Sequence, residues 1–132
     1  MIRLMTLLAE SAITDNCKVK PVGEVTCKWD TGNTTRASAL HAQDIQVQDG
    51  KVAWTFKDQP YSAELHGYST PSGRDKRPVI ATTLEWRDKT ISVLIALVDR
   101  SNNTADLLCN MDVMQALGIQ IDTRTMQAYT KD

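Results

Sequence analysis

The chain has 132 residues and a mass of 14.7 kDa, which fits one domain over residues 1–132 and excludes a complete TIM barrel of about 250 residues. Lys and Arg number 15 against 16 Asp and Glu, so the net charge of −1 gives no bulk electrostatic basis for binding nucleic acid or a membrane surface. No apolar run approaches the roughly 18 residues of a membrane-spanning helix. The three cysteines, an odd count without C-x-x-C spacing, favour buried thiols in a reducing compartment and hence a cytoplasmic protein.

Short β-strands are predicted for most of the first half of the chain. Residues 1–9 fit a helical face or an extended arm, and we favour the arm. Residues 25–29 alternate polar and apolar side chains, as a half-buried strand does. Alternating runs at 45–47 and 52–56 flank Asp49-Gly50, a dipeptide typical of a two-residue hairpin turn. A further strand is expected within 61–68, followed by a loop or hairpin tip over 69–78.

Two long strands, a short helix and a closing hairpin are predicted for the second half. Residues 79–86 and 90–98 read as strands joined at 87–89, and the second is apolar enough to be buried on both faces. Asn110 as N-cap and Gly118 as C-terminal stop delimit a helix over 111–117. Residues 119–128 suggest a hairpin around 122–124. The sequence therefore predicts a mainly β protein, a barrel or a sandwich, with one short C-terminal helix.

Asp30, Thr31 and Gly32 follow directly on the strand at 25–29. The strand end places the carboxylate at the rim of the sheet, the Thr31 hydroxyl can lock the turn, and Gly32 lets its N–H approach the carboxylate. The same tripeptide also occurs in ordinary turns. Two facing carboxylates share one proton, so one acts as a base toward water and the other as an acid toward a carbonyl oxygen. A chain with one D-T-G obtains the second carboxylate only from a two-fold symmetric homodimer.

Three sequence blocks resemble a bacterial family labelled ATP-dependent zinc proteases, whose members are similar to the retropepsins, the one-domain dimeric aspartic peptidases. The blocks are Asp30-Thr-Gly with Ser38-Ala-Leu-His41-Ala, then Ser72-Gly73 with Arg77-Pro-Val-Ile and Asp99-Arg-Ser, and finally Leu107-Leu-Cys109-Asn110. They correspond to the family patterns D-T-G-A-x-T-S-A-L-H-A, S-x-G…R-P-V-I…T-D-R-S and L-L-G-R. The resemblance covers residues 19–129 and leaves residues 1–18 as an N-terminal arm.

The resemblance implies a closed retropepsin-like (acid protease) barrel in which Asp30 is the catalytic residue and Thr31 and Gly32 shape its turn. It also implies a flap within residues 61–77 that closes over an extended peptide. Some relatives are associated with ligases that add glutamates to proteins, which makes a glutamate-rich peptide a candidate substrate. No G-x-x-x-x-G-K-[ST] loop supports the ATP-dependent part of the label.

Four further residues are candidates for substrate binding. Ser38 and His41 lie in the S-A-L-H-A block, although a hydrogen-bonded structural role is the stronger interpretation of His41. Arg74 and Arg77 belong to a basic cluster at a loop tip, which either holds carboxylates through paired donors or is simply solvated.

No metal site or cofactor is predicted. The two histidines and three cysteines show no H-E-x-x-H or C-x-x-C spacing. The three tryptophans fall in strand-like segments and are expected in the core or a dimer interface rather than as a stacking platform for bases. Cys109 has no histidine near it in the sequence and is interpreted as an inert buried thiol.

Departures from the family pattern leave two functional interpretations open. The segment between Gly32 and Ser38 is two residues longer than usual, and Cys109 and Asn110 replace the family's Gly and Arg. A side chain in place of that Gly requires the chain to shift, and misplacement by about 1 Å can cost about 10²-fold in rate. The first interpretation is a homodimeric aspartic peptidase with Asp30 from each subunit. The second is a catalytically silent copy of the fold that serves as a structural or binding subunit, for example in a phage virion or its assembly.

Overall fold

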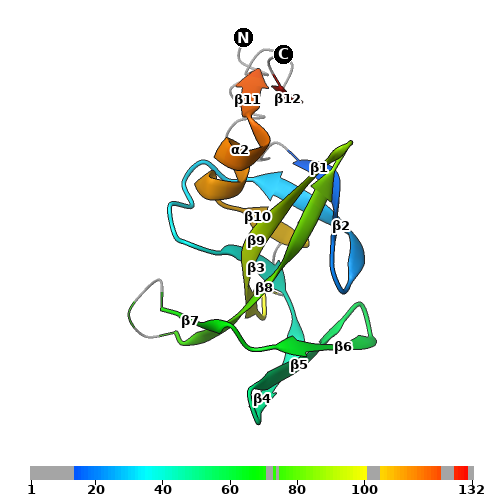
Figure 1. Ribbon diagram of the computed structural model, residues 1–132, viewed down its shortest axis with the longest axis vertical. Coiled ribbons are helices and arrows are strands. Elements are labelled where there is room, and N and C mark those ends of the chain that lie inside the picture. Colours follow the sequence, from blue (N-terminus) through cyan, green and yellow to red (C-terminus); the bar gives the residue numbers. More distant parts are fainter. Residues whose placement is uncertain (1–13, 71–72, 74, 101–104, 123–126, 131–132) are drawn as a thin grey trace.

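A closed barrel of six strands forms the centre of the computed structural model, which describes residues 14–70, 73, 75–100, 105–122 and 127–130 (Figure 1). In spatial order the barrel strands are β1 (Thr14–Val19), β2 (Gly23–Trp29), β10 (Leu107–Cys109), β3 (Ser38–His41), β9 (Lys89–Val98) and β8 (Arg77–Trp86). The barrel closes because β1 pairs with β2 on one side and, at Lys18 and Val19, with β8 on the other. The prediction of a mainly β barrel is thereby confirmed, and the sandwich alternative is excluded.

The remaining elements extend from the barrel. They are β7 (Gly67–Ser69), which pairs with β8; the antiparallel sheet of β4 (Gln43–Gln48), β5 (Lys51–Phe56) and β6 (Gln59–Glu64); helix α2 (Met111–Leu117); and the hairpin of β11 (Ile119–Asp122) and β12 (Gln127–Thr130). The three-stranded sheet and the β11–β12 hairpin lie at opposite ends of the molecule (Figure 1). Among the described residues, no helix is long and apolar enough to cross a membrane.

One large hydrophobic cluster fills the barrel and extends under the three-stranded sheet. Trp29 and Trp86 meet edge to face with ring centroids 5.6 Å apart, and Trp54 stacks on Tyr61 of the neighbouring strand at 6.1 Å. All three tryptophans are buried, which confirms that they are core residues. Alternate residues of β5 are buried, so one face of its sheet joins the core while the other faces solvent.

Two-residue turns close the sharp hairpins. Asp49 and Gly50 join β4 to β5 with φ angles of 53° and 75°. Positive φ at both central positions is the type I′ geometry that matches the twist of paired strands, so the predicted hairpin is confirmed. The β8–β9 hairpin turns on Arg87 and Asp88, which makes it one residue shorter than predicted because Lys89 already pairs with Trp86.

Helix α2 begins and ends where its capping residues predict. The Asn110 side chain accepts a hydrogen bond from the amide of Val113, which satisfies a free N–H of the first turn. Gly118 has a φ of 69°, a left-handed conformation that glycine adopts without strain, and its amide bonds back to the last turn. The hairpin predicted after the helix is also present.

Three strands of the barrel carry no sequence signal that predicts them. They are β1, β3 and β10, which are short or polar on alternate residues and become strands by pairing within the barrel. The strand predicted over 61–68 is divided into β6 and β7. The chain passes there from one sheet to the other, since the Leu65 amide bonds to Gly50 and the His66 amide bonds to Val79. The arm proposed for residues 1–9 lies outside the described residues.

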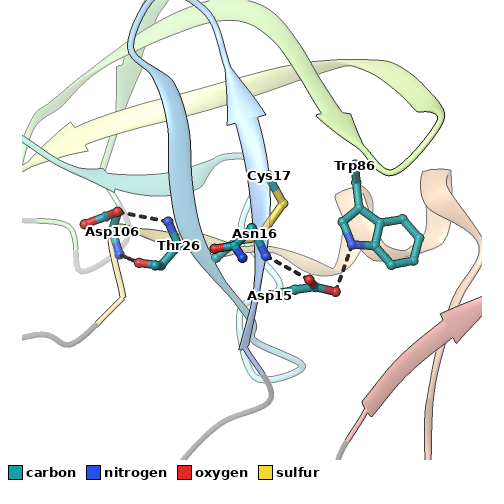
Figure 2. The surroundings of a disulfide bond; sticks show 7 residues. Asp15, Asn16, Cys17, Thr26, Trp86 and Asp106 are labelled. Carbon is teal, nitrogen blue, oxygen red and sulfur yellow. Dashed lines mark hydrogen bonds between the residues drawn. A yellow bond between two sulfur atoms is a disulfide. The ribbon is translucent and has the colours of Figure 1, made fainter.

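The prediction of three buried thiols is wrong for two of the cysteines. Cys17 of β1 and Cys27 of β2 form a disulfide with their Cα atoms 6.3 Å apart (Figure 2). In the antiparallel register Cys17 lies opposite Val25, so the two cysteines are diagonal neighbours with side chains on the same inner face. Three cysteines can form one disulfide and leave one free thiol. The number of cysteines therefore does not support a reducing compartment.

Candidate functional site

Asp30 lies at the rim of the barrel where the parallel strands β2 and β10 end side by side. Its amide donates to the carbonyl oxygen of Cys109 at 3.0 Å, which continues the ladder one residue beyond β2. The amide of Gly32 donates to Oδ1 of Asp30 at 3.1 Å, and the amide of Asn33 donates to the Asp30 carbonyl oxygen at 3.0 Å. Thr31 is exposed, so the bonds that hold this turn come from Gly32 and Asn33. The half-buried carboxylate is thus oriented by the turn itself.

The loop after Gly32 is fastened to the start of helix α2. The Asn33 carbonyl oxygen accepts from the amide of Met111 at 2.9 Å, while its Oδ1 accepts from the amide of Thr35 at 3.1 Å. The side-chain amide of Asn110 donates to the Thr35 carbonyl oxygen at 2.8 Å. The segment that is longer than the family spacing is therefore an ordered, hydrogen-bonded loop.

Cys109 connects the Asp30 turn to the hydrophobic core. Its side chain is completely buried within the main hydrophobic cluster, while its carbonyl oxygen accepts from Asp30. Burial raises the pKa of the thiol far above its ordinary value, because the thiolate has no solvation there. The thiol is free and buried, which confirms the prediction of a buried thiol at Cys109; a thiol that stays protonated is a poor nucleophile.

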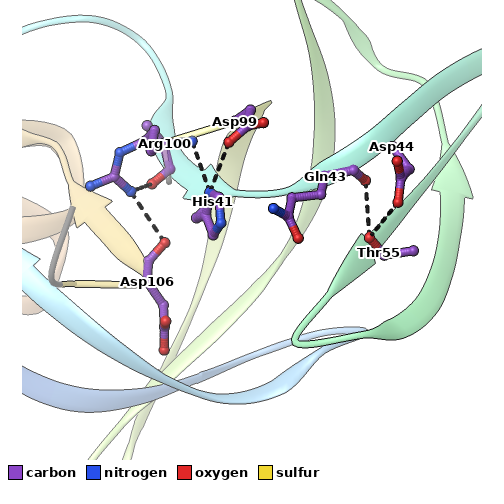
Figure 3. Close-up of polar contacts among 8 residues, drawn as sticks. His41, Gln43, Asp44, Thr55, Asp99, Arg100 and Asp106 are labelled. Atoms are coloured by element: carbon purple, nitrogen blue, oxygen red, sulfur yellow. Dashed lines mark hydrogen bonds and ion pairs between the residues drawn. The ribbon is translucent and has the colours of Figure 1, made fainter. Parts of the chain in front are cut away.

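Ser38 and His41 lie at opposite ends of β3. Ser38 is fully buried beside the Asp30 turn, where its hydroxyl accepts from the amide of Asn110 at 3.1 Å and donates to Oδ1 of Asn110 at 3.2 Å. Nδ1 of His41 accepts from the backbone amide of Arg100 at 2.8 Å and lies 3.8 Å from Asp99 (Figure 3). Both residues are therefore held by protein contacts, and Ser38 has no surface to offer a substrate.

Arg100 is a buried cation next to strand β3 and the residues that lead into β10. Its guanidinium donates to the carbonyl oxygens of Ala39 at 3.1 Å and Asp106 at 3.2 Å (Figure 3). Burial lowers its pKa most and the positive charge of Arg77 adds to this, while the carboxylates of Asp106 and Asp30 act in the opposite direction. Arg77 and Arg100 are thus within electrostatic reach of one another, and the Asp30 charge also reaches Arg100.

Two surface cavities lie beside the Asp30 loop. The larger, of about 530 Å³, lies between helix α2 and the β8–β9 ribbon and is mainly apolar. The second, of about 460 Å³, lies between residues 35–37 and strand β7, where His66 and Tyr68 line it. Arg36 and Leu94 line both cavities, so the two are neighbours. Asp30 lines neither of them, although the loop that it begins forms a wall of each.

The basic cluster at the tip of the β7–β8 hairpin is only partly described. Arg74 lies outside the described residues. Arg77 starts β8, is half-buried and pairs with Asp75 at 3.6 Å. Lys76 places its Nζ 4.2 Å from the centroid of the exposed Tyr68 ring. These contacts stay within the hairpin, and the structure does not bring Arg77 together with Ser38 or His41 in one cavity wall.

No metal-binding geometry is found in the described ranges, where no three His, Cys, Asp or Glu side chains converge. His66 is exposed and directly precedes β7, and His41 at the end of β3 accepts a hydrogen bond from the Arg100 amide. The Cys17 and Cys27 sulfurs are bonded to each other. The residues present therefore offer a carboxylate and hydrogen-bond donors rather than a set of metal ligands.

Comparison with known proteins identifies a solved structure with a similar fold. No protein-family model matches the sequence, and no curated protein matches it. A crystal structure of the Legionella pneumophila protein Lpg0085, of unknown function (DUF785), superposes with a TM-score of 0.67. The two chains are 22% identical, and the match covers 84% of this chain and 90% of that one. The barrel is therefore a fold with a solved precedent, and the likeness extends over most of both chains.

Sequence reasoning overlooks three residues that shape the site. Arg36 has no motif around it, and its position between two cavities depends on how the loop folds. Asn110 is visible as an N-cap, but its bond to Thr35 joins positions 75 apart in the chain. Arg100 stands in the D-R-S block, which could have signalled it as a structural cation.

Proposed function

We propose that this chain is a retropepsin-like aspartic peptidase that acts as a homodimer, with Asp30 of each protomer in a shared dyad. The observation that carries the proposal is the Asp30-Thr31-Gly32 turn at the rim of a closed six-stranded barrel, held by Cys109 of the adjacent parallel strand. Because the chain has one such turn, a single protomer has half of the two-carboxylate site. Asp30 lines neither large cavity, which is in keeping with a cleft that a second protomer completes.

The proposed reaction is hydrolysis of a peptide bond by an activated water. One carboxylate of the dyad takes a proton from the water while the other gives its proton to the carbonyl oxygen of the substrate. As these protons move, the water oxygen bonds to the carbonyl carbon. The tetrahedral intermediate collapses when the C–N bond breaks: the first carboxyl gives the proton that it took from water to the leaving amine, and the second takes back a proton from a hydroxyl of the intermediate, which leaves a carboxylic acid product and the dyad as it began. The Gly32 amide, which donates to Oδ1 of Asp30, keeps the carboxylate in one orientation during these transfers.

The second cavity is the proposed contact site for the peptide. It lies between the Asp30 loop and β7, and β7 leads into the hairpin that the family resemblance assigns as the flap. Exposed Arg36 and half-buried Arg77, with Arg74 three residues before Arg77 in the sequence, favour an acidic peptide, and a glutamate-rich one is the candidate that the resemblance implies. Ser38 and His41 belong in this proposal as supports of the barrel rim rather than as substrate contacts.

The test combines assembly and cleavage. Sedimentation equilibrium should show a dimer, and fluorogenic peptide libraries at pH 4–8, neutral and glutamate-rich, should be cleaved by the wild type. Asp30→Asn should abolish cleavage, because the amide cannot exchange the proton. Asp88→Asn, an exposed carboxylate in the β8–β9 turn, is the matched control and should retain full activity. A dimer that cleaves neither library, or cleavage that survives Asp30→Asn, would refute the proposal.

A second candidate is a silent copy of the same fold that serves as a structural or binding subunit, in a virion or another assembly. Cys109 in place of the family's Gly favours this candidate, since its buried side chain fixes the packing behind the Asp30 turn. The two candidates differ in the dimer itself. A peptidase needs the two Asp30 carboxylates within hydrogen-bonding distance across the two-fold axis, whereas an assembly subunit has no such requirement.

A further inference from the structure

We infer that Asn110 is a positioning residue that sets the conformation of the loop carrying Asp30 and Arg36; its consequence for catalysis rests on the proposed function. The loop runs from Asp30 to Ser38, and three consecutive residues at the end of β10, Cys109, Asn110 and Met111, hold it along its whole length.

The bonds are distributed over the beginning, middle and end of the loop. The Cys109 carbonyl oxygen accepts from Asp30 at 3.0 Å, and the Met111 amide donates to the Asn33 carbonyl oxygen at 2.9 Å. The Asn110 side chain adds the bond to Thr35 at 2.8 Å. At the loop's end the Asn110 amide donates to the Ser38 hydroxyl at 3.1 Å. In these four bonds residues 109–111 contribute backbone atoms, except in the bond to Thr35, where the donor is the Asn110 side chain.

Asparagine is the side chain that this position requires. Its Oδ1 accepts from the Val113 amide and from the Ser38 hydroxyl, both at 3.2 Å, while its Nδ2 donates to Thr35. An aspartate would keep the acceptor that caps helix α2 but would turn an oxygen toward the Thr35 carbonyl oxygen. Asn110 is 1% exposed, so no bulk water reaches the site to replace the lost donor.

The bond to Thr35 also reaches beyond the Asp30 turn. The Thr35 carbonyl belongs to the planar peptide that links Thr35 to Arg36, so fixing that oxygen fixes the peptide plane at which Arg36 begins and narrows the directions that its side chain can take. Arg36 lines both cavities. Asn110 therefore holds the middle of the loop that has the site carboxylate at its start and, directly after Thr35, the cation that would face a peptide.

The test is Asn110→Asp, with Asn16→Asp on the exposed part of β1 as the matched control. Thermal unfolding should show both variants folded, because aspartate is as good an N-cap as asparagine. We expect amide hydrogen exchange at Gly32 and Asn33 to become at least about tenfold faster in Asn110→Asp alone. With the cleaved fluorogenic peptide, kcat should fall about 10- to 100-fold while KM changes less, since misplacement of about 1 Å costs that much.

A second variant keeps the inference testable if Asn110→Asp does not fold. Asn110→Ser retains an N-cap acceptor and lacks the donor to Thr35, so it should show the same fast exchange. Unchanged exchange at Gly32 and Asn33 in a folded variant would overturn the inference, and so would a loss of kcat no larger than the loss of folded protein. If the wild type cleaves no peptide in an Asp30-dependent manner, the proposed function fails, and the exchange measurements still decide the role of Asn110.

Discussion

The amide of Asp30 bonds to the carbonyl oxygen of Cys109 at 3.0 Å, while the Cys109 side chain points the other way, into the hydrophobic core. The site carboxylate and the core are thus joined through a single residue. Because the bond uses a backbone carbonyl, any residue at position 109 can make it. The identity of the side chain at position 109 matters instead for the hydrophobic packing behind the turn, where the cysteine is fully buried.

Replacing Cys109 with glycine, the residue found in the L-L-G-R pattern that this segment resembles, should therefore lower the stability of this protein. Removing the buried sulfur in Cys109→Ala should cost about 1 kcal/mol of unfolding free energy. Cys109→Gly should cost about 0.5–1 kcal/mol more, because glycine gains more backbone freedom on unfolding. Urea unfolding of the two variants measures both values. A Cys109→Gly protein as stable as the wild type would show that the core behind Asp30 is loosely packed.

The buried thiol should also make stability depend on pH at the alkaline end. Burial raises the pKa of Cys109 above its ordinary value of 9.0, so the folded state keeps a proton that the unfolded state releases. The contribution is fully present below pH 9 and is lost as the pH rises above it, at about 1 kcal/mol per pH unit. Unfolding free energies at pH 7–10.5 should fall more steeply for the wild type than for Cys109→Ala. Parallel curves would contradict the burial of the thiol.

The sequence predicts well those features that depend on neighbouring residues. The Asp49-Gly50 turn, the long β8–β9 hairpin and both caps of helix α2 follow from local preferences for φ, periodicity and side-chain acceptors. The position of Asp30 at a strand end is of the same kind. Its carboxylate is held by Gly32, two residues along the chain.

The features that escape prediction depend on pairings between distant residues. Strand β10 has three residues and is a strand because it lies between β2 and β3. Cys17 and Cys27 are joined because the β1–β2 register makes them diagonal neighbours, which a count of cysteines cannot reveal. Ser38 appears as a site residue in the motif, but the fold buries it against Asn110.

The Cys17–Cys27 disulfide should add measurably to stability. The two cysteines are 10 residues apart, and a closed loop of that length lowers the entropy of the unfolded chain enough to stabilise the fold by about 2–3 kcal/mol. Reduction should lower the unfolding free energy by this amount in the wild type. Stability of a Cys17→Ala, Cys27→Ala double variant should not respond to the reductant. Titration of the unfolded, unreduced protein should find one thiol, and a count of three would contradict the pairing.

Asp106 should stabilise the barrel through its bonds to Thr26 rather than through its ion pair. Its Oδ2 accepts from the Thr26 amide at 2.9 Å and its amide donates to the Thr26 hydroxyl at 2.9 Å (Figure 2), while Lys57 lies 3.4 Å from the same carboxylate. The Asp106 side chain is 17% exposed and that of Lys57 is 63% exposed.

Asp106→Ala leaves the Thr26 amide without its acceptor and should cost about 2 kcal/mol. Lys57→Ala removes an exposed ion pair and a contact with the Phe56 ring, and should cost less than about 0.5 kcal/mol. Urea unfolding at low and high salt distinguishes the two contributions, because screening weakens only the ion pair. Equal losses in the two variants, or a loss in Asp106→Ala that salt removes, would assign the stabilisation to the ion pair instead.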